Sequence, residues 1–120
     1  MNANISALEK QLDDFNTASR HHALVKLAEI VNCGELARPH ELPVHNLHGH
    51  TFFSYNCYGY SPSHYAWLAF RHGFEAVGVV DFDVLDALEE FHEACCLLNM
   101  RSVVSLESRT FVPEFSSRVI

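Results

Sequence analysis

Two histidines separated by a single residue, His48 and His50, have the spacing that indicates chemistry most directly in this sequence. They belong to the run Asn46-Leu47-His48-Gly49-His50-Thr51, in which Gly49 is expected to let the backbone turn tightly. This run ends a predicted short strand over residues 44–48, in which side chains two positions apart face the same way. Two neutral imidazoles on one face can bind one metal ion together, and Zn, Mn and Fe all accept such ligands. A pair of polar loop histidines is the alternative that this motif alone leaves open.

Carboxylates follow the next two predicted strands. Asp81 and Asp83 come directly after an apolar strand over residues 76–80, and Glu107 follows a strand over residues 102–106. In α/β barrels the active site lies at the carboxyl ends of parallel strands. Asp83 can equally be a helix N-cap, so Asp81 is the preferred catalytic carboxylate. Glu107 could bridge two metal ions, with a surface glutamate as the alternative.

The elements around these residues alternate between strand and helix. Ser61 and Pro62 are a typical N-cap and first helical residue, and Gly73 is a typical stop, so a helix is predicted between the first two strands. A second helix with an apolar stripe is predicted after Asp83. The order strand, helix, strand, helix, strand predicts parallel βα units, and therefore an α/β fold.

The N-terminal part has a different pattern. Residues 5–33 are predicted to be helical, with a capping box from Ser6 to Glu9, a polar break over residues 17–22 and a stop at Gly34. We expect residues 1–36 to form a helical extension that packs on a core made by residues 44–120.

The three strand-end motifs together resemble the PHP (polymerase and histidinol phosphatase) domain family. Residues 46–51 are similar to the family motif D-L-H-x-H-T. Residues 80–83 are similar to the family motif T-D-H-D, which follows a strand of the pattern G-h-x-x-h-x-h (h, apolar). Residues 105–107 are similar to the family motif G-x-E. The resemblance covers about residues 44–112. It implies the N-terminal portion, about three βα units, of a distorted (β/α)₇ barrel. Three strands cannot close a barrel, so residues 44–120 are expected to be an incomplete PHP domain.

The resemblance also implies a function. His48 and His50 would be metal ligands and Glu107 a bridging ligand in a site for two or three divalent ions. Family members hydrolyse phosphomonoesters or serve as polymerase-associated domains. The implied activity is therefore that of a metal-dependent phosphoesterase on a phosphorylated small molecule, whose identity the sequence does not give. The aromatic residues after the first strand could line a substrate mouth or pack the barrel rim: Phe52, Phe53, Tyr55, Tyr58 and Tyr60.

Three positions depart from the family pattern. Asn46 replaces the leading aspartate, Phe82 replaces the histidine of T-D-H-D, and Tyr55 stands where an acidic residue often occurs. A later D-x-H motif would lie beyond Ile120. We therefore expect this chain to be inactive or impaired as a phosphoesterase. A non-catalytic metal-binding or structural PHP domain that supports a partner is the alternative, and an interaction module built on the N-terminal helices is a third.

Composition narrows the choice of partners and compartment. The net charge is −7, and the 8 Lys and Arg residues form no basic run, which argues against a nucleic-acid partner. No apolar stretch is long enough to span a bilayer, and the N-terminus lacks the pattern of a signal peptide. The cysteines form no C-x-x-C pair, which favours reduced thiols in the cytoplasm: Cys33, Cys57, Cys95 and Cys96.

Overall fold

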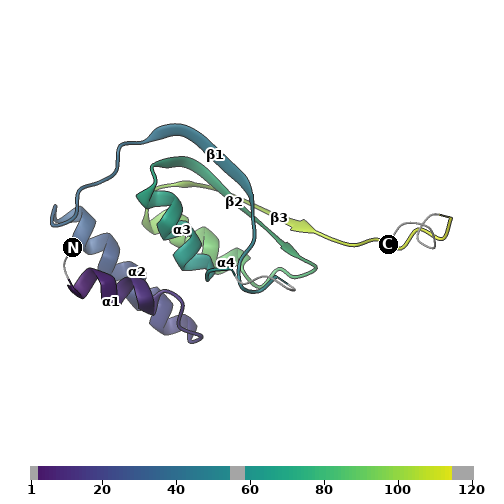
Figure 1. Ribbon diagram of the computed structural model, residues 1–120, viewed down its shortest axis with the longest axis horizontal. Helices are drawn as coiled ribbons and strands as arrows, with labels where there is room; N and C mark the ends of the chain where they lie inside the picture. The colour runs from purple at the N-terminus through teal and green to yellow at the C-terminus, as the bar shows by residue number, and fades with distance from the viewer. Residues whose placement is uncertain (1–2, 55–58, 115–120) are drawn as a thin grey trace.

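The computed structural model describes residues 3–54 and 59–114 as a parallel α/β fold (Figure 1). Its elements, in chain order, are α1 (Ala3–Gln11), α2 (Thr17–Asn32), β1 (Leu42–Gly49), α3 (Pro62–Arg71), β2 (Phe74–Phe82), α4 (Leu88–Leu97) and β3 (Arg101–Glu107). The three strands form one parallel sheet in the order β1-β2-β3. The predicted α/β class and the parallel βα units are therefore confirmed.

The central strand β2 connects the sheet to the hydrophobic core. Val77 and Val79 are fully or almost fully buried and join the core side chains of α3 and α4, among them Trp67 and Phe91. The helices lie on one side of the sheet (Figure 1). Both outer strands, β1 and β3, are exposed over most of their length. The apolar run of β2 is buried, because it lies between two neighbouring strands and packs on the helices.

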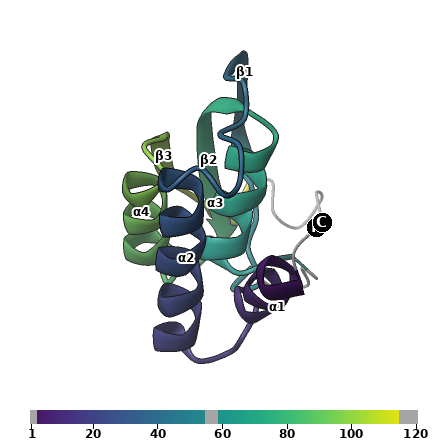
Figure 2. The same ribbon diagram turned by 90° about the vertical axis from the view of Figure 1, so that its left-hand side faces the viewer.

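The N-terminal helices share this core. Apolar side chains of α1 and α2 belong to the same buried cluster as those of α3 and α4. Figure 2 shows α2 running beside α4, with α1 next to it. The division into an extension over residues 1–36 and a domain over residues 44–120 stays a prediction.

Three local predictions in and around the helices were wrong. The break between α1 and α2 lies at residues 12–16, because Asn16 is the N-cap of α2 and accepts a hydrogen bond from the Ser19 N–H at 3.0 Å. Helix α1 already includes Ala3, so Ser6 is not its N-cap. Asp83 does not cap α4, which begins at Leu88 after Ala87.

Strand β1 is longer than predicted and begins at Leu42. Pro43 lies within it, although proline has no N–H to donate to a sheet ladder. The residue is tolerated because β1 is an outer strand of the sheet. Within the described residues, no helix is long and apolar enough to cross a membrane.

Candidate metal centre

The structure brings His48, His50 and Glu107 together at the carboxyl end of the sheet. His48 lies in the last residues of β1, His50 follows the strand directly, and Glu107 ends β3, with β2 between the two strands. The Glu107 Oε2 atom lies 3.1 Å from Nε2 of His48 and 3.4 Å from Nε2 of His50. One possible ligand atom from each residue lies within 4.8 Å of the other two. Two imidazoles and a carboxylate at this spacing suit Zn, Mn or Fe.

The surroundings of the Glu107 Oε2 atom indicate whether these residues fit a metal ion. It is buried, and among the described residues it accepts no hydrogen bond of good geometry, although two imidazole nitrogens lie within 3.4 Å. A buried carboxylate oxygen without a hydrogen bond is costly, so its presence calls for a cation or another partner. A divalent ion bound by both imidazoles would satisfy this oxygen, and the three residues therefore fit a metal site.

His50 is the better fixed of the two histidines. Its Nδ1 atom lies 3.2 Å from the Ser54 hydroxyl oxygen, and its ring stacks on Phe82 at 4.4 Å between centroids. A hydrogen bond at one ring nitrogen sets the orientation of the other, which here leaves Nε2 directed to Glu107. The His48 side chain is 66 % exposed, and its ring meets that of His50 edge-on at 5.2 Å between centroids. Its backbone N–H donates to Asn46 Oδ1.

Asp81, the predicted catalytic carboxylate, is 2 % exposed and holds the turn that follows β1. Its carboxylate accepts from the Thr51 N–H at 2.6 Å, the Thr51 hydroxyl at 2.6 Å and the Ser54 hydroxyl at 2.7 Å. Ser54 in turn contacts His50, so Asp81 acts on the metal group through one intermediate side chain. We treat Asp81 as a positioning residue, and a direct catalytic role stays a prediction.

Gly49 serves a different purpose from the tight turn that was expected. A Cβ atom at this position would collide with the Tyr65 hydroxyl and ring from α3. The Tyr65 hydroxyl donates to the Gly78 carbonyl at 3.0 Å, which ties α3 to the central strand directly under β1. The glycine between the two histidines is therefore required by close packing of α3 against β1.

Asp83 fixes the chain around Glu107, a role that the sequence did not indicate. Its φ of 60° is unusual for a non-glycine residue, and its N–H donates to the Glu107 carbonyl at 2.8 Å. The carboxylate also accepts from the Arg109 guanidinium at 3.0 Å and from the Ser108 hydroxyl at 3.2 Å. The only sequence signal was the Ser108-Arg109 pair directly after Glu107. Hydrogen bonds from the side chain and backbone of Arg109 hold the pKa of Asp83 below its ordinary value.

We expect Asp83→Ala to lower Mn²⁺ affinity by up to about tenfold at pH 7, because the residues after Glu107 lose their support. Glu75→Ala is the matched control, since Glu75 is similarly exposed (31 % against 36 %) and pairs with His45 away from Glu107. Because the folded pKa of Asp83 is lowered, its support is present above its ordinary pKa and is lost as the pH falls through the folded value. Calorimetric titration of both variants checks this, and equal losses in the two would contradict it.

The other histidines in described positions are held by local partners. His45 lies 2.9 Å from Glu75, His64 lies 2.6 Å from Asp13, and His92 lies 3.1 Å from the Ser102 hydroxyl oxygen. In the part of the chain that the structure describes, none of these three belongs to the group around Glu107.

Among the residues that the structure describes, no cysteine belongs to the group around Glu107. Cys33, Cys95 and Cys96 are free thiols. Burial raises the pKa of Cys95 to about 12, so its thiol stays protonated and inert at neutral pH. Cys57, together with Tyr55 and Tyr58, lies outside the described residues.

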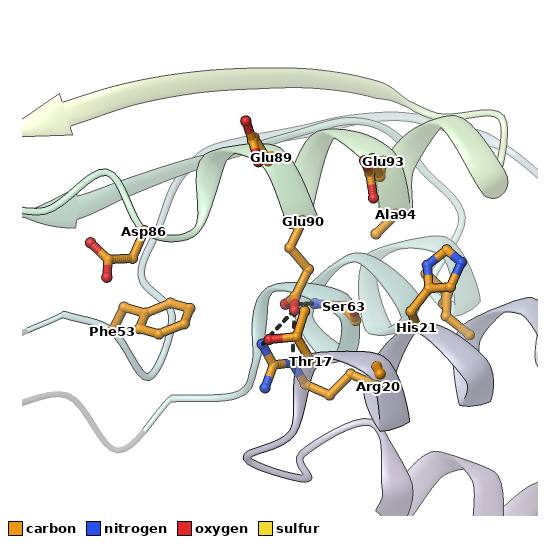
Figure 3. Close-up of a pocket in the computed structure, with 12 residues that line it drawn as sticks. Thr17, Arg20, His21, Phe53, Ser63, Asp86, Glu89, Glu90, Glu93 and Ala94 are labelled. Atoms are coloured by element: carbon orange, nitrogen blue, oxygen red, sulfur yellow. Dashed lines mark hydrogen bonds and ion pairs between the residues drawn. The ribbon is translucent and has the colours of Figure 1, made fainter.

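A cavity of about 510 Å³ lies away from the metal group, between α2 and α4 (Figure 3). Its floor is an ion pair, in which an Arg20 guanidinium nitrogen lies 2.5 Å from the Glu90 carboxylate. The Ser63 N–H also donates to Glu90, at 3.2 Å. Figure 3 shows Glu90 reaching from α4 toward Arg20. These buried charges are satisfied by each other, so the contact joins the N-terminal helices to α4.

Comparison with known proteins adds no relative: no protein family, curated protein or solved structure matches this chain.

Proposed function

We propose that this chain carries the first part of a metal-dependent phosphoesterase site of the PHP type. The observation that carries the proposal is the buried Glu107 Oε2 atom, which lies against two imidazole nitrogens with no hydrogen bond from a described residue. The resemblance of the three strand-end motifs to the PHP pattern adds the reaction class. The barrel of that family and a phosphorylated small-molecule substrate belong to the same proposal.

Each residue of the candidate metal centre has a distinct role in this proposal. A bound divalent ion would polarise a phosphoryl oxygen and lower the pKa of a water molecule. His48, His50 and Glu107 would hold the ion, and Ser54 and Phe82 keep the His50 ring in place. Asp81 keeps Ser54 in place through a buried hydrogen bond.

Phe82 limits the activity expected of the chain. It lies opposite Glu107 on the neighbouring strand and stacks on His50, so an apolar ring stands where the family motif has a histidine. This favours a second candidate function, a metal-binding domain without catalysis that supports a partner. Turnover separates the two functions, and metal binding is common to both.

The test is titration with Mn²⁺ and with Zn²⁺, followed by assay with p-nitrophenyl phosphate. We expect one ion to bind and turnover by this chain to be low. If neither ion binds, as measured by calorimetry at pH 7, the proposed site is refuted. Rapid metal-dependent turnover that His48→Ala abolishes would show instead that the chain is a competent enzyme.

We expect Phe82→His to raise Mn²⁺ affinity by about tenfold, because it adds an imidazole beside His50 and opposite Glu107. Phe82 is only half-buried, so placing an unpaired imidazole there should cost no more than about 1–3 kcal/mol. Leu97→His, at an exposed position on α4, is the control. Calorimetry and thermal unfolding are measured together. A variant that is less stable and binds no more metal would identify Phe82 as a purely structural residue.

A further inference from the structure

A second cavity, of about 550 Å³, adjoins the candidate metal centre between β1 and α3. His50 belongs both to its lining and to the group formed with His48 and Glu107, so the two sites share this residue. Asn46, from the same strand, also lines it. A cavity of this volume is typical of a site for a small organic molecule.

The wall of this cavity is mainly aromatic and aliphatic. It includes Tyr60, Tyr65, Leu68 and Phe74. The Tyr65 hydroxyl is occupied by the Gly78 carbonyl, and the Tyr65 ring stacks on Phe91 in the core, so this ring has a fixed position. Burial raises the pKa of Tyr65 to about 12, so the phenol is neutral at pH 7.

The polar groups of the lining are few and carry no fixed charge. They include the amide of Asn46 and the imidazoles of His50 and His72, and among the described lining residues there is no Lys, Arg, Asp or Glu. Asn46 uses Oδ1 to accept from the His48 N–H, which leaves its amide N–H groups as donors. Such a surface suits an apolar ring with one or two acceptor atoms. It does not suit a second phosphate or a polyhydroxylated sugar, because each buried polar group needs a partner.

We propose that this cavity receives the organic group of the phosphomonoester, and that this group is a compact, uncharged ring. The inference rests on the proposed function, which places the phosphate at His48, His50 and Glu107. The ring would then lie on the α3 side of His50, against Tyr65 and Leu68.

Binding of two phosphonates that cannot be hydrolysed tests the inference. Phenylphosphonate and methylphosphonate present the same anionic group, and they differ only in the ring. With the Mn²⁺-loaded protein, we expect phenylphosphonate to bind on the order of tenfold more tightly in calorimetric titration. Leu68→Trp should fill the cavity and remove this preference. Leu97→Trp, an equivalent change at an exposed position on α4, should retain it.

The results separate the cavity from the metal centre. Equal affinities for the two phosphonates, or a preference that survives in Leu68→Trp, would overturn the cavity inference while the metal site stands. Failure of both Mn²⁺ and Zn²⁺ to bind would overturn the proposed function and this inference together. If Leu68→Trp does not fold, as judged by circular dichroism, then Tyr60→Ala takes its place, since Tyr60 is 50 % exposed, and it should weaken the preference.

Discussion

His50→Ala is expected to lower the affinity of the chain for Mn²⁺ or Zn²⁺ by at least about 100-fold. Loss of a residue that only supports a metal ligand lowers affinity by up to about 100-fold, and loss of a residue that contacts the metal should lower it by at least as much. His50 is the best-fixed residue of the candidate metal centre, held by Ser54 at one ring nitrogen and by the face of Phe82. Its loss leaves one exposed imidazole and one carboxylate, which form at most a weak two-ligand site. Calorimetric titration of the metal into both proteins measures the effect.

His45→Ala is the matched control for this experiment. His45 lies on β1, the strand that leads to His50, and also carries an imidazole, but it pairs with Glu75 and is not in the group around Glu107. We expect its metal affinity to equal that of the unmodified chain. Equal losses in the two variants would mean that metal binds nonspecifically to imidazoles on β1, and the site would then be refuted.

Asp81→Ala is expected to destabilise the fold by about 3–5 kcal/mol, because a buried carboxylate with three hydrogen bonds is replaced by a methyl group. Two donors from Thr51 and one from Ser54 would lose their acceptor in a buried place. A loss of this size is a large fraction of the stability of a small domain. Urea unfolding, followed by circular dichroism, gives the change in free energy.

Asp81→Asn separates positioning from direct catalysis. The amide keeps one oxygen acceptor, so the chain should fold with a smaller loss, about 1–3 kcal/mol, while Ser54 and His50 become less well fixed. We expect metal affinity to fall together with stability. If the asparagine variant keeps its stability and its metal affinity but loses phosphatase turnover, Asp81 acts directly on the reaction. Thr51→Val serves as the control that removes one hydroxyl and leaves the carboxylate in place.

The parts of the fold that repeat with a regular period were predictable. The alternation of strands and helices gave the parallel sheet, and the two-residue period of strands placed His48 and His50 on one face, near Glu107. The function of Asp83 was not predictable, because it depends on Arg109, which lies on another strand end. The local pattern before α4 was equally compatible with a helix cap.

Two further features depended on tertiary contacts. Gly49 was interpreted as a turn residue, but its requirement comes from Tyr65, which arrives from α3. Asp81 looked available for chemistry because it follows a strand, yet the turn after β1 folds back to enclose it with Thr51 and Ser54. Strand-end position therefore indicates where a side chain lies, while burial and partners decide what it can do.

The residues of the candidate metal centre come from the ends of the two outer strands of the sheet, which pair with β2 and not with each other. A bound ion would therefore link the ends of β1 and β3 through metal–ligand bonds across the end of β2. Both outer strands are largely exposed on their surfaces, so such a crosslink would restrain the two elements with the least burial to hold them. The melting temperature would then rise with free metal concentration, and a chelator would release both edges of the sheet at once.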